Sequence, residues 1–110
     1  GSTDGRGIKV AATATAGTLI HTGSTTATTL DEVWLYAVNT SASDVKLTIE
    51  WGGVTAPDDL VEYTVKAENG LYLIVAGGLI KGNATALIVR AFAATGNVIV
   101  VHGYVNQITA

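Results

Sequence analysis

From Leu30 onward, the sequence is a series of short β-prone segments separated by turn residues. The strands predicted from their content of Val, Ile, Tyr and Trp lie at residues 32–39, 44–51, 60–67, 70–76, 85–93 and 97–106. Turn signals separate them at 39–44, 52–59, 68–70, 76–83 and 95–97. No segment has a convincing helical period. Short strands at intervals of about a dozen residues favour an all-β chain, an antiparallel β-sandwich or jelly roll of about seven to eight strands.

The 110 residues are enough for one domain. Residues 1–29 are rich in Thr, Ala and Gly, and residues 8–22 are expected to form either one or two light strands or an extended arm. We expect residues 1–16 to be a flexible N-terminal arm that orders on docking, and residues 17–110 to be the β-sandwich domain. We interpret Gly1 and Ser2 as residues that remain after a tag has been cleaved off.

Two turn signals lead to specific expectations. Glu-Asn-Gly at residues 68–70 predicts a hairpin, because Asn and Gly tolerate the positive φ that such turns need. The glycine-rich segment 77–85 contains a lysine but lacks the spacing of a phosphate-binding loop, and no helix follows it, so we interpret it as a turn.

Two of the predicted strands alternate between apolar and polar residues, which indicates one buried and one solvated face. In the segment 44–51, the residues expected to face the core are Val45, Leu47, Ile49 and Trp51, and those expected to face water are Lys46, Thr48 and Glu50. The segment 60–67 has the same pattern, with Val61, Tyr63 and Val65 inward.

The other four predicted strands are apolar on both faces. We assign their aliphatic faces to the core, with Val33, Leu35, Ala37, Leu71, Leu73, Val75, Leu87, Val89, Ala91, Ile99, Val101 and Val105. The opposite faces carry Trp, Tyr and Arg, residue types that are enriched at protein interfaces. We therefore predict an oligomer interface formed by Trp34, Tyr36, Tyr72, Ile74, Ile88, Arg90, His102 and Tyr104.

Two alternatives to this interface remain open. Residues 8–29 would cover the second apolar face if they folded back over it. A β-bulge would shift the alternation of side chains and place some of these residues in the core. Otherwise, an apolar face of this size on a small chain predicts contact with another copy or with a partner protein.

The composition argues against several classes of partner. Charged residues make up 14% of the chain, the net charge is −3, and the six Lys and Arg residues are scattered, so no nucleic-acid-binding patch is expected. No segment reaches the length of a membrane-spanning helix and no signal peptide is visible, so we expect no membrane partner. There is no cysteine, and hence no disulfide framework.

The chain offers no recognisable catalytic or metal-binding constellation. Asp58 and Asp59 follow Pro57, which is good turn chemistry, and adjacent carboxylates usually point apart. His21 and His102 lack a clear third ligand for zinc. We predict no enzyme activity, no metal and no cofactor. The triplets beginning at Asn39 and Asn83 match the glycosylation signal, but such triplets are common by chance and we assign them no glycan.

A family resemblance rests on the segment VNTSASDVKLTIEWGG, the polar PDD loop and the last strand VIVVHGYVN. In the overall character of its sequence, the range 17–108 resembles small structural proteins of tailed bacteriophages, in particular the Thr-rich β-sandwich proteins that decorate capsids or lie at the head–tail region. The resemblance implies a non-enzymatic, homotrimeric virion protein that binds the major capsid protein or another virion protein and is assembled in the bacterial cytoplasm. A tail or neck component and a carbohydrate-binding β-sandwich module, with Trp34, Tyr36 and Tyr72 as the sugar platform, are the alternatives.

Overall fold

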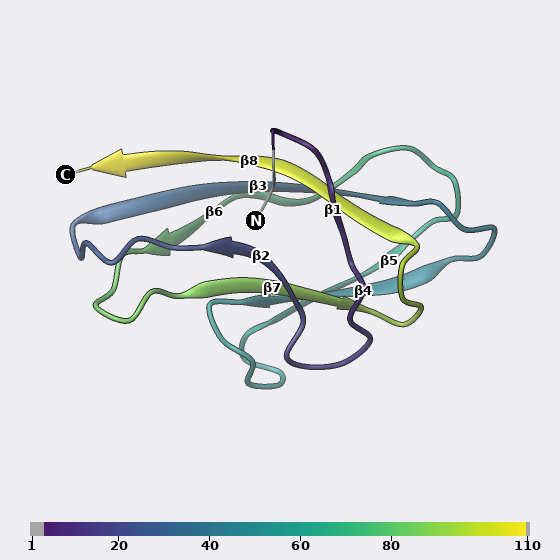
Figure 1. Ribbon diagram of the computed structural model, residues 1–110, viewed down its shortest axis with the longest axis horizontal. Coiled ribbons are helices and arrows are strands. Elements are labelled where there is room, and N and C mark those ends of the chain that lie inside the picture. The colour runs from purple at the N-terminus through teal and green to yellow at the C-terminus, as the bar shows by residue number, and fades with distance from the viewer. Residues whose placement is uncertain (1–3, 110) are drawn as a thin grey trace.

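The computed structural model describes residues 4–109, which form two packed antiparallel β-sheets (Figure 1). No helix occurs in this range, so no helix there could cross a membrane. The strands of the described range are β1 (Ile8–Lys9), β2 (Thr18–Thr22), β3 (Thr29–Asn39), β4 (Val45–Trp51), β5 (Leu60–Val65), β6 (Tyr72–Lys81), β7 (Ile88–Ala93) and β8 (Ile99–Thr109).

The order of the strands is that of a jelly roll. Sheet A has the order β1-β8-β3-β6 and sheet B the order β2-β7-β4-β5. The pairs β1–β8, β2–β7, β3–β6 and β4–β5 are all neighbours, so the chain is a long hairpin with β4 and β5 at its tip, wound into two layers. The all-β sandwich predicted from the sequence is confirmed.

The turn at residues 68–70 does not join neighbouring strands, as the hairpin prediction required. β5 belongs to sheet B and β6 to sheet A, so this turn carries the chain from one sheet to the other. The positive φ angles fall on Glu68 (50°) and Gly70 (71°), while Asn69 has none. The hairpin within a sheet is instead formed by β4 and β5, across residues 52–59.

The core lies between the sheets and follows the predicted alternation on most strands. On β3, β4 and β7, the inward residues are almost fully buried, including Val33, Leu35, Ala37, Leu47, Ile49, Val89 and Ala91. From β8, Ile99 and Val101 join them. Val105 shares their side of β8 but is 37% exposed, because the sandwich is open along that part of the strand.

Part of the expected N-terminal arm belongs to the sandwich. Ile8 and Lys9 pair with Val101 and Val100 of β8, and Val10 is fully buried in the core. The first three residues of the arm lie outside the described range.

Strand β6 departs from the predicted alternation because it contains two bulges. Its register with β3 shifts between Val33 and Trp34 and again between Leu35 and Tyr36. The first shift coincides with Gly77, whose φ of 71° is favourable for glycine. As a result Leu73, predicted to be in the core, is 38% exposed. The strand also continues to Lys81, through residues that we expected to form a turn.

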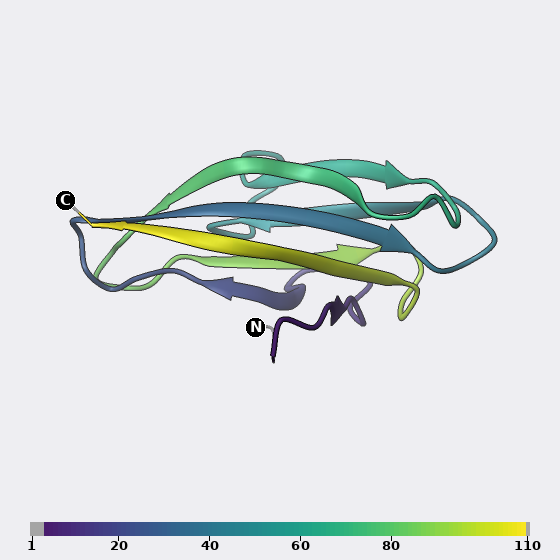
Figure 2. The same ribbon diagram turned by 90° about the horizontal axis from the view of Figure 1, so that it is seen from above.

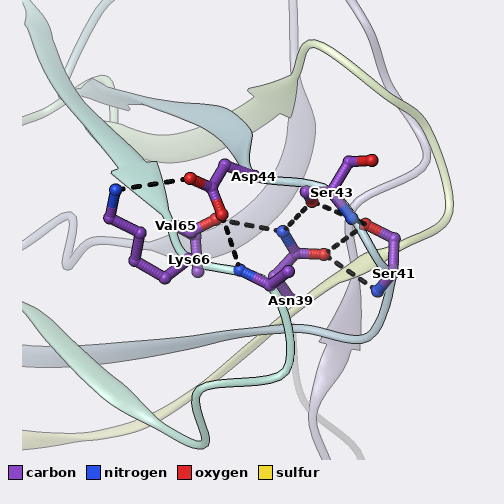
Figure 3. A network of polar contacts seen from close by, with 7 residues as sticks. Asn39, Ser41, Ser43, Asp44, Val65 and Lys66 are labelled. Atoms are coloured by element: carbon purple, nitrogen blue, oxygen red, sulfur yellow. Dashed lines mark hydrogen bonds and ion pairs between the residues drawn. The ribbon is translucent and has the colours of Figure 1, made fainter.

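A buried asparagine organises the turn between β3 and β4 (Figure 3). The Asn39 side chain is fully buried and its amide donates to the carbonyl oxygens of Ser43 and Val65, at 2.8 and 3.0 Å. Its Oδ1 accepts hydrogen bonds from the backbone and hydroxyl of Ser41, at 2.9 and 2.7 Å. Both of these donor bonds come from the amide nitrogen, which is therefore committed to the fold.

The neighbouring Asp44 ties the same turn to the end of β5. Its carboxylate accepts a hydrogen bond from the backbone N–H of Ala67 at 2.9 Å and pairs with Lys66 at 3.3 Å. These contacts, the backbone hydrogen bond first, lower the pKa of Asp44 below its ordinary value of 3.8. The folded state therefore favours the charged form.

We expect this contact to give a measurable acid sensitivity. Because the folded-state pKa of Asp44 is depressed, its contribution to stability is complete above pH 3.8 and disappears as the pH falls through the lower folded-state value. Asp44→Asn should lower the melting temperature at pH 7, and the difference from the original protein should shrink below pH 3.8. Thermal melts between pH 2 and 7 test this, with the exposed Asp58→Asn as control. A difference in melting temperature that stays constant from about pH 2 to 7 would contradict a lowered pKa of Asp44 in the folded state.

Candidate interaction surface

The outer face of sheet A brings together four of the residues predicted for an interface. Trp34 and Tyr36 project outward from β3, and their register partners on β8 are Tyr104 and His102. The rings of Trp34 and Tyr104 stack, with centroids 5.9 Å apart and planes 11° from parallel. Tyr104 is 52% exposed, while the other three side chains are half-buried. The predicted grouping therefore holds for these two strands.

Aliphatic side chains extend this face on both sides of the aromatic pairs. On β6, Leu73 lies opposite Tyr36 and Leu79 opposite Glu32, and both leucines are exposed. On β8, Ile108 is also exposed. We define the outer face of sheet A by these residues: Trp34, Tyr36, Leu73, Leu79, His102, Tyr104 and Ile108. Exposed apolar side chains that gather on one face of a sheet often mark an interaction site.

A small polar cluster lies beside the aromatic pair. Glu32 accepts hydrogen bonds from the indole N–H of Trp34 at 3.0 Å and from the side-chain amide of Asn106 at 3.1 Å. These two bonds, the one from Trp34 first, lower the pKa of Glu32 below its ordinary value of 4.5. The cluster fixes the orientation of the indole and places a carboxylate and an amide at the border of an exposed aromatic surface.

The other predicted interface residues lie elsewhere, so the eight residues do not form one surface. Ile88 and Arg90 project from β7 on the outer face of sheet B, on the opposite side of the sandwich. Ile74 packs against the core, at the position of the second bulge. Tyr72 turns toward the other sheet and stacks on Tyr63 of β5, with ring centroids 4.6 Å apart. A hydrogen bond with Tyr72 raises the pKa of Tyr63.

The outer face of sheet B is partly covered by residues 13–17, which we call the strap. The carboxylate of Glu50 on β4 accepts hydrogen bonds from the Thr15 hydroxyl and from the backbone N–H of Gly17, the latter at 2.7 Å. Arg90, which lies beside Glu50 in the sheet, donates to the carbonyl of Gly17 at 3.3 Å. Glu50 is fully buried as a result.

The position of the strap shows that one prediction was wrong, and it decides one of the alternatives that the sequence left open. Thr48 and Glu50 were expected to face water, but both are buried, with exposures of 2% and 0%. The N-terminal segment does fold back, but over sheet B. On sheet A, Gly7 lies against Val100 and His102 only at the end of the face next to β1.

An inter-sheet polar contact that the sequence analysis missed lies at the open side of the sandwich. His21 of β2 is 2.7 Å from the almost fully buried carboxylate of Asp31 on β3, and the Gln107 side-chain amide donates to the same carboxylate at 3.1 Å. Beside it is a cavity of about 290 Å³. Its lining combines core residues with the edge of β8: Arg6, Ile8, Ile20, His21, Val33, Leu35, Val101, His102, Gly103, Tyr104 and Val105.

The residues considered for catalysis or metal binding are not brought together. Asp59 accepts a hydrogen bond from the backbone of Thr55 at 3.0 Å and so shapes the turn after β4, while Asp58 is exposed. His21 faces Asp31, whereas His102 belongs to the outer face of sheet A. Within residues 4–109, no group of three or more His, Asp or Glu side chains could hold a metal ion.

Comparisons of the chain with models of protein families, with curated proteins and with solved structures find no match. A function for the chain can therefore be inferred only from its own residues and from the surface they form.

Proposed function

We propose that the chain is a non-enzymatic structural protein of a tailed-bacteriophage virion, where it acts as a homotrimeric capsid decoration protein. The observation that supports this most is the apolar outer face of sheet A, which the described residues leave largely uncovered. Jelly rolls are common in viral capsid proteins but also occur in lectins and cupins, so the fold alone does not select this role. A tail or neck component would use the same surface and is the nearest alternative.

The proposed trimer covers this face with neighbouring copies. A stable contact of ordinary size hides about 800 Å² on each partner. The trimer then binds the assembled shell. Because such binding favours the assembled state over the free subunits, it stabilises the shell by mass action.

The first test is the mass of the protein in solution. In light-scattering measurements at about 10 μM, a concentration at which interfaces of this size are usually formed, we expect about three times the chain mass of 11.2 kDa. Tyr36→Asp places a charge in the centre of the outer face of sheet A and should reduce the mass to that of one chain. Burying an unpaired carboxylate costs several kcal/mol, which is enough to dissociate the trimer.

The matched control is Thr64→Asp, which puts the same charge at an exposed position of β5 in sheet B. It should leave the mass unchanged, and circular dichroism should show that both variants keep the β-sheet fold. A monomeric original protein, or a Tyr36→Asp variant with unchanged mass, would contradict the proposed trimer.

The virion role needs a separate test. Purified particles of a phage that encodes this chain should contain it in many copies by mass spectrometry, and gold-labelled antibodies should mark the head. Label confined to the tail or neck would favour the alternative position. If the chain is missing from the particles altogether, the virion proposal fails.

A carbohydrate-binding module is the second candidate, because Glu32 and Asn106 lie beside the exposed Trp34–Tyr104 pair. Aromatic rings pack against the apolar faces of sugars, while a neighbouring carboxylate and amide can bind the hydroxyl groups. A glycan array distinguishes the two functions. Binding that free sugar competes away, and that Trp34→Ala abolishes, would favour this candidate over the structural role.

A further inference from the structure

The last strand of sheet A has an open edge along most of its length. β1 pairs with β8 only at Val100 and Val101, while β3 pairs with the whole of β8 on the other side. Figure 2 shows β1 beside one end of β8 only, and the rest of β8 extends along the long axis past β2 and β7. Residues 103–109 are all exposed, and within the described range no other strand pairs with their open side.

The backbone of this segment is directed so that it can receive another strand. The carbonyl of Ile99 accepts a hydrogen bond from Val10, on the β1 side of β8. In an antiparallel sheet, alternate residues direct their N–H and C=O groups to the same side. The register with β3 is regular over the whole strand, so the groups of Gly103, Val105, Gln107 and Thr109 are directed to the open side.

The edge strands β6, β5 and β2 are protected against pairing, whereas the open part of β8 is not. β6 contains two bulges and ends in Lys81, and β5 carries Glu62 and is followed by Lys66. β2 is short and has a bulge. Charges, bulges and short length are the usual devices that prevent edge-to-edge association. Residues 103–109, with the sequence GYVNQIT, contain no charge and no proline, and their register has no shift.

We propose that this open edge of β8, residues 103–109, pairs antiparallel with the same segment of a second copy of the chain. The segment fits itself because it carries no charge that would oppose a like charge across a two-fold axis. The side chains of Tyr104 and Ile108, which are 52% and 46% exposed, would gain apolar partners.

Hydrogen bonding selects the register of the pair. With Asn106 on the two-fold axis, Gly103 lies opposite Thr109 and Val105 opposite Gln107 of the second copy, and about eight backbone hydrogen bonds form. With Val105 on the axis, about six form. The Asn106 register also places Tyr104 opposite Ile108 of the second copy, on the outer side of the joined sheet.

This contact uses the backbone edge of β8 and not the outer face of sheet A that the proposed trimer uses, although Tyr104 and Ile108 belong to both surfaces. A single added strand buries less area than a standard interface, so the contact is weak and depends on a high local concentration. Copies arranged side by side on a surface would meet that condition.

Cross-linking through a single cysteine tests the pairing, because the chain has no cysteine of its own. In the proposed register, the two copies of residue 106 form a non-hydrogen-bonded pair, whose Cα atoms are about 4.5 Å apart and within reach of a disulfide. Asn106→Cys should therefore give at least about fivefold more oxidised dimer than Tyr104→Cys, whose sulfur atoms would lie more than about 10 Å apart.

The same test in the Tyr36→Asp background separates this contact from the trimer. Cross-linking at residue 106 should persist there, whether or not the trimer proposal is correct. Loss of cross-linking in that background would assign the contact to the outer face of sheet A and overturn the proposed edge pairing.

Two further variants disrupt the edge without disturbing the fold. Val105→Pro removes an N–H directed to the open side, a position where proline is tolerated in an edge strand. Thr109→Lys places a positive charge at the end of the pair and is the milder change. With an Asn106→Cys reporter, Val105→Pro should reduce the dimer to the level of Tyr104→Cys, and Thr109→Lys should reduce it partly. Cross-linking that neither variant lowers, in a folded protein, would overturn the proposal.

Discussion

Asn39→Ala is expected to lower the free energy of unfolding by about 2–4 kcal/mol, a large fraction of the stability of a small domain. The side chain makes four hydrogen bonds in a site with no solvent exposure. Its removal leaves the buried carbonyl of Val65 without this donor, and an unsatisfied buried group costs about 1–3 kcal/mol. Urea denaturation of the original protein and the variant measures the loss.

Asn83→Ala is the matched control. Asn83 begins the other Asn-x-Thr/Ser triplet, but it is exposed and its amide makes one hydrogen bond, to the carbonyl of Thr85. Its replacement should change stability by no more than about 0.5 kcal/mol. If the two variants lost equal stability, the hydrogen bonds of Asn39 would contribute no more to the free energy of unfolding than the single exposed one of Asn83.

Glu50→Ala is expected to cost about 2–3 kcal/mol and to release the strap from sheet B. The buried carboxylate accepts bonds from Thr15 and Gly17, and hydrogen bonds to a charged group are about twice as strong as neutral ones. Without it, the N–H of Gly17, itself a buried residue, loses its acceptor. Hydrogen exchange should therefore accelerate at Gly17, and a protease should cut more readily between residues 13 and 17.

Two variants separate the strap from a general loss of stability. Thr15→Ala removes one of the two bonds and should cost about 0.5–1.5 kcal/mol. Glu62→Ala removes an exposed ion pair with Lys46, whose atoms are 3.0 Å apart, and should cost less than about 1 kcal/mol. Unchanged exchange at Gly17 in Glu50→Ala would show that the strap is held by other contacts.

Local alternation predicted most of the fold because it is a property of single strands. Val33, Leu35 and Ala37 alternate with larger or polar-tipped residues, and the structure places them in the core. The alternation on β6 failed because a bulge adds a residue, and Gly77 and Gly78 have the composition of a turn. From the sequence alone, a glycine pair within a strand and a glycine pair between strands look the same.

The candidate surface was predicted in part for a related reason. Alternation assigns side chains to a face of their own strand but does not say which strands share a sheet. Trp34 and Tyr104 share sheet A, whereas Arg90 belongs to sheet B. The residues predicted to form a single surface therefore lie on two sides of the molecule. The burial of Glu50 depends on Thr15 and Gly17, more than thirty residues away, and no local pattern signals such a contact.

The jelly-roll topology also determines when the chain can fold during its synthesis. β4 and β5 are close in sequence and can meet early, but β8 is made last and fills the place between β1 and β3. A ribosome-bound chain that lacks β8 leaves a gap in the middle of sheet A, not at its border. Folding should therefore wait until the last strand leaves the exit tunnel, and closure should be slow because it joins the two most distant parts of the chain.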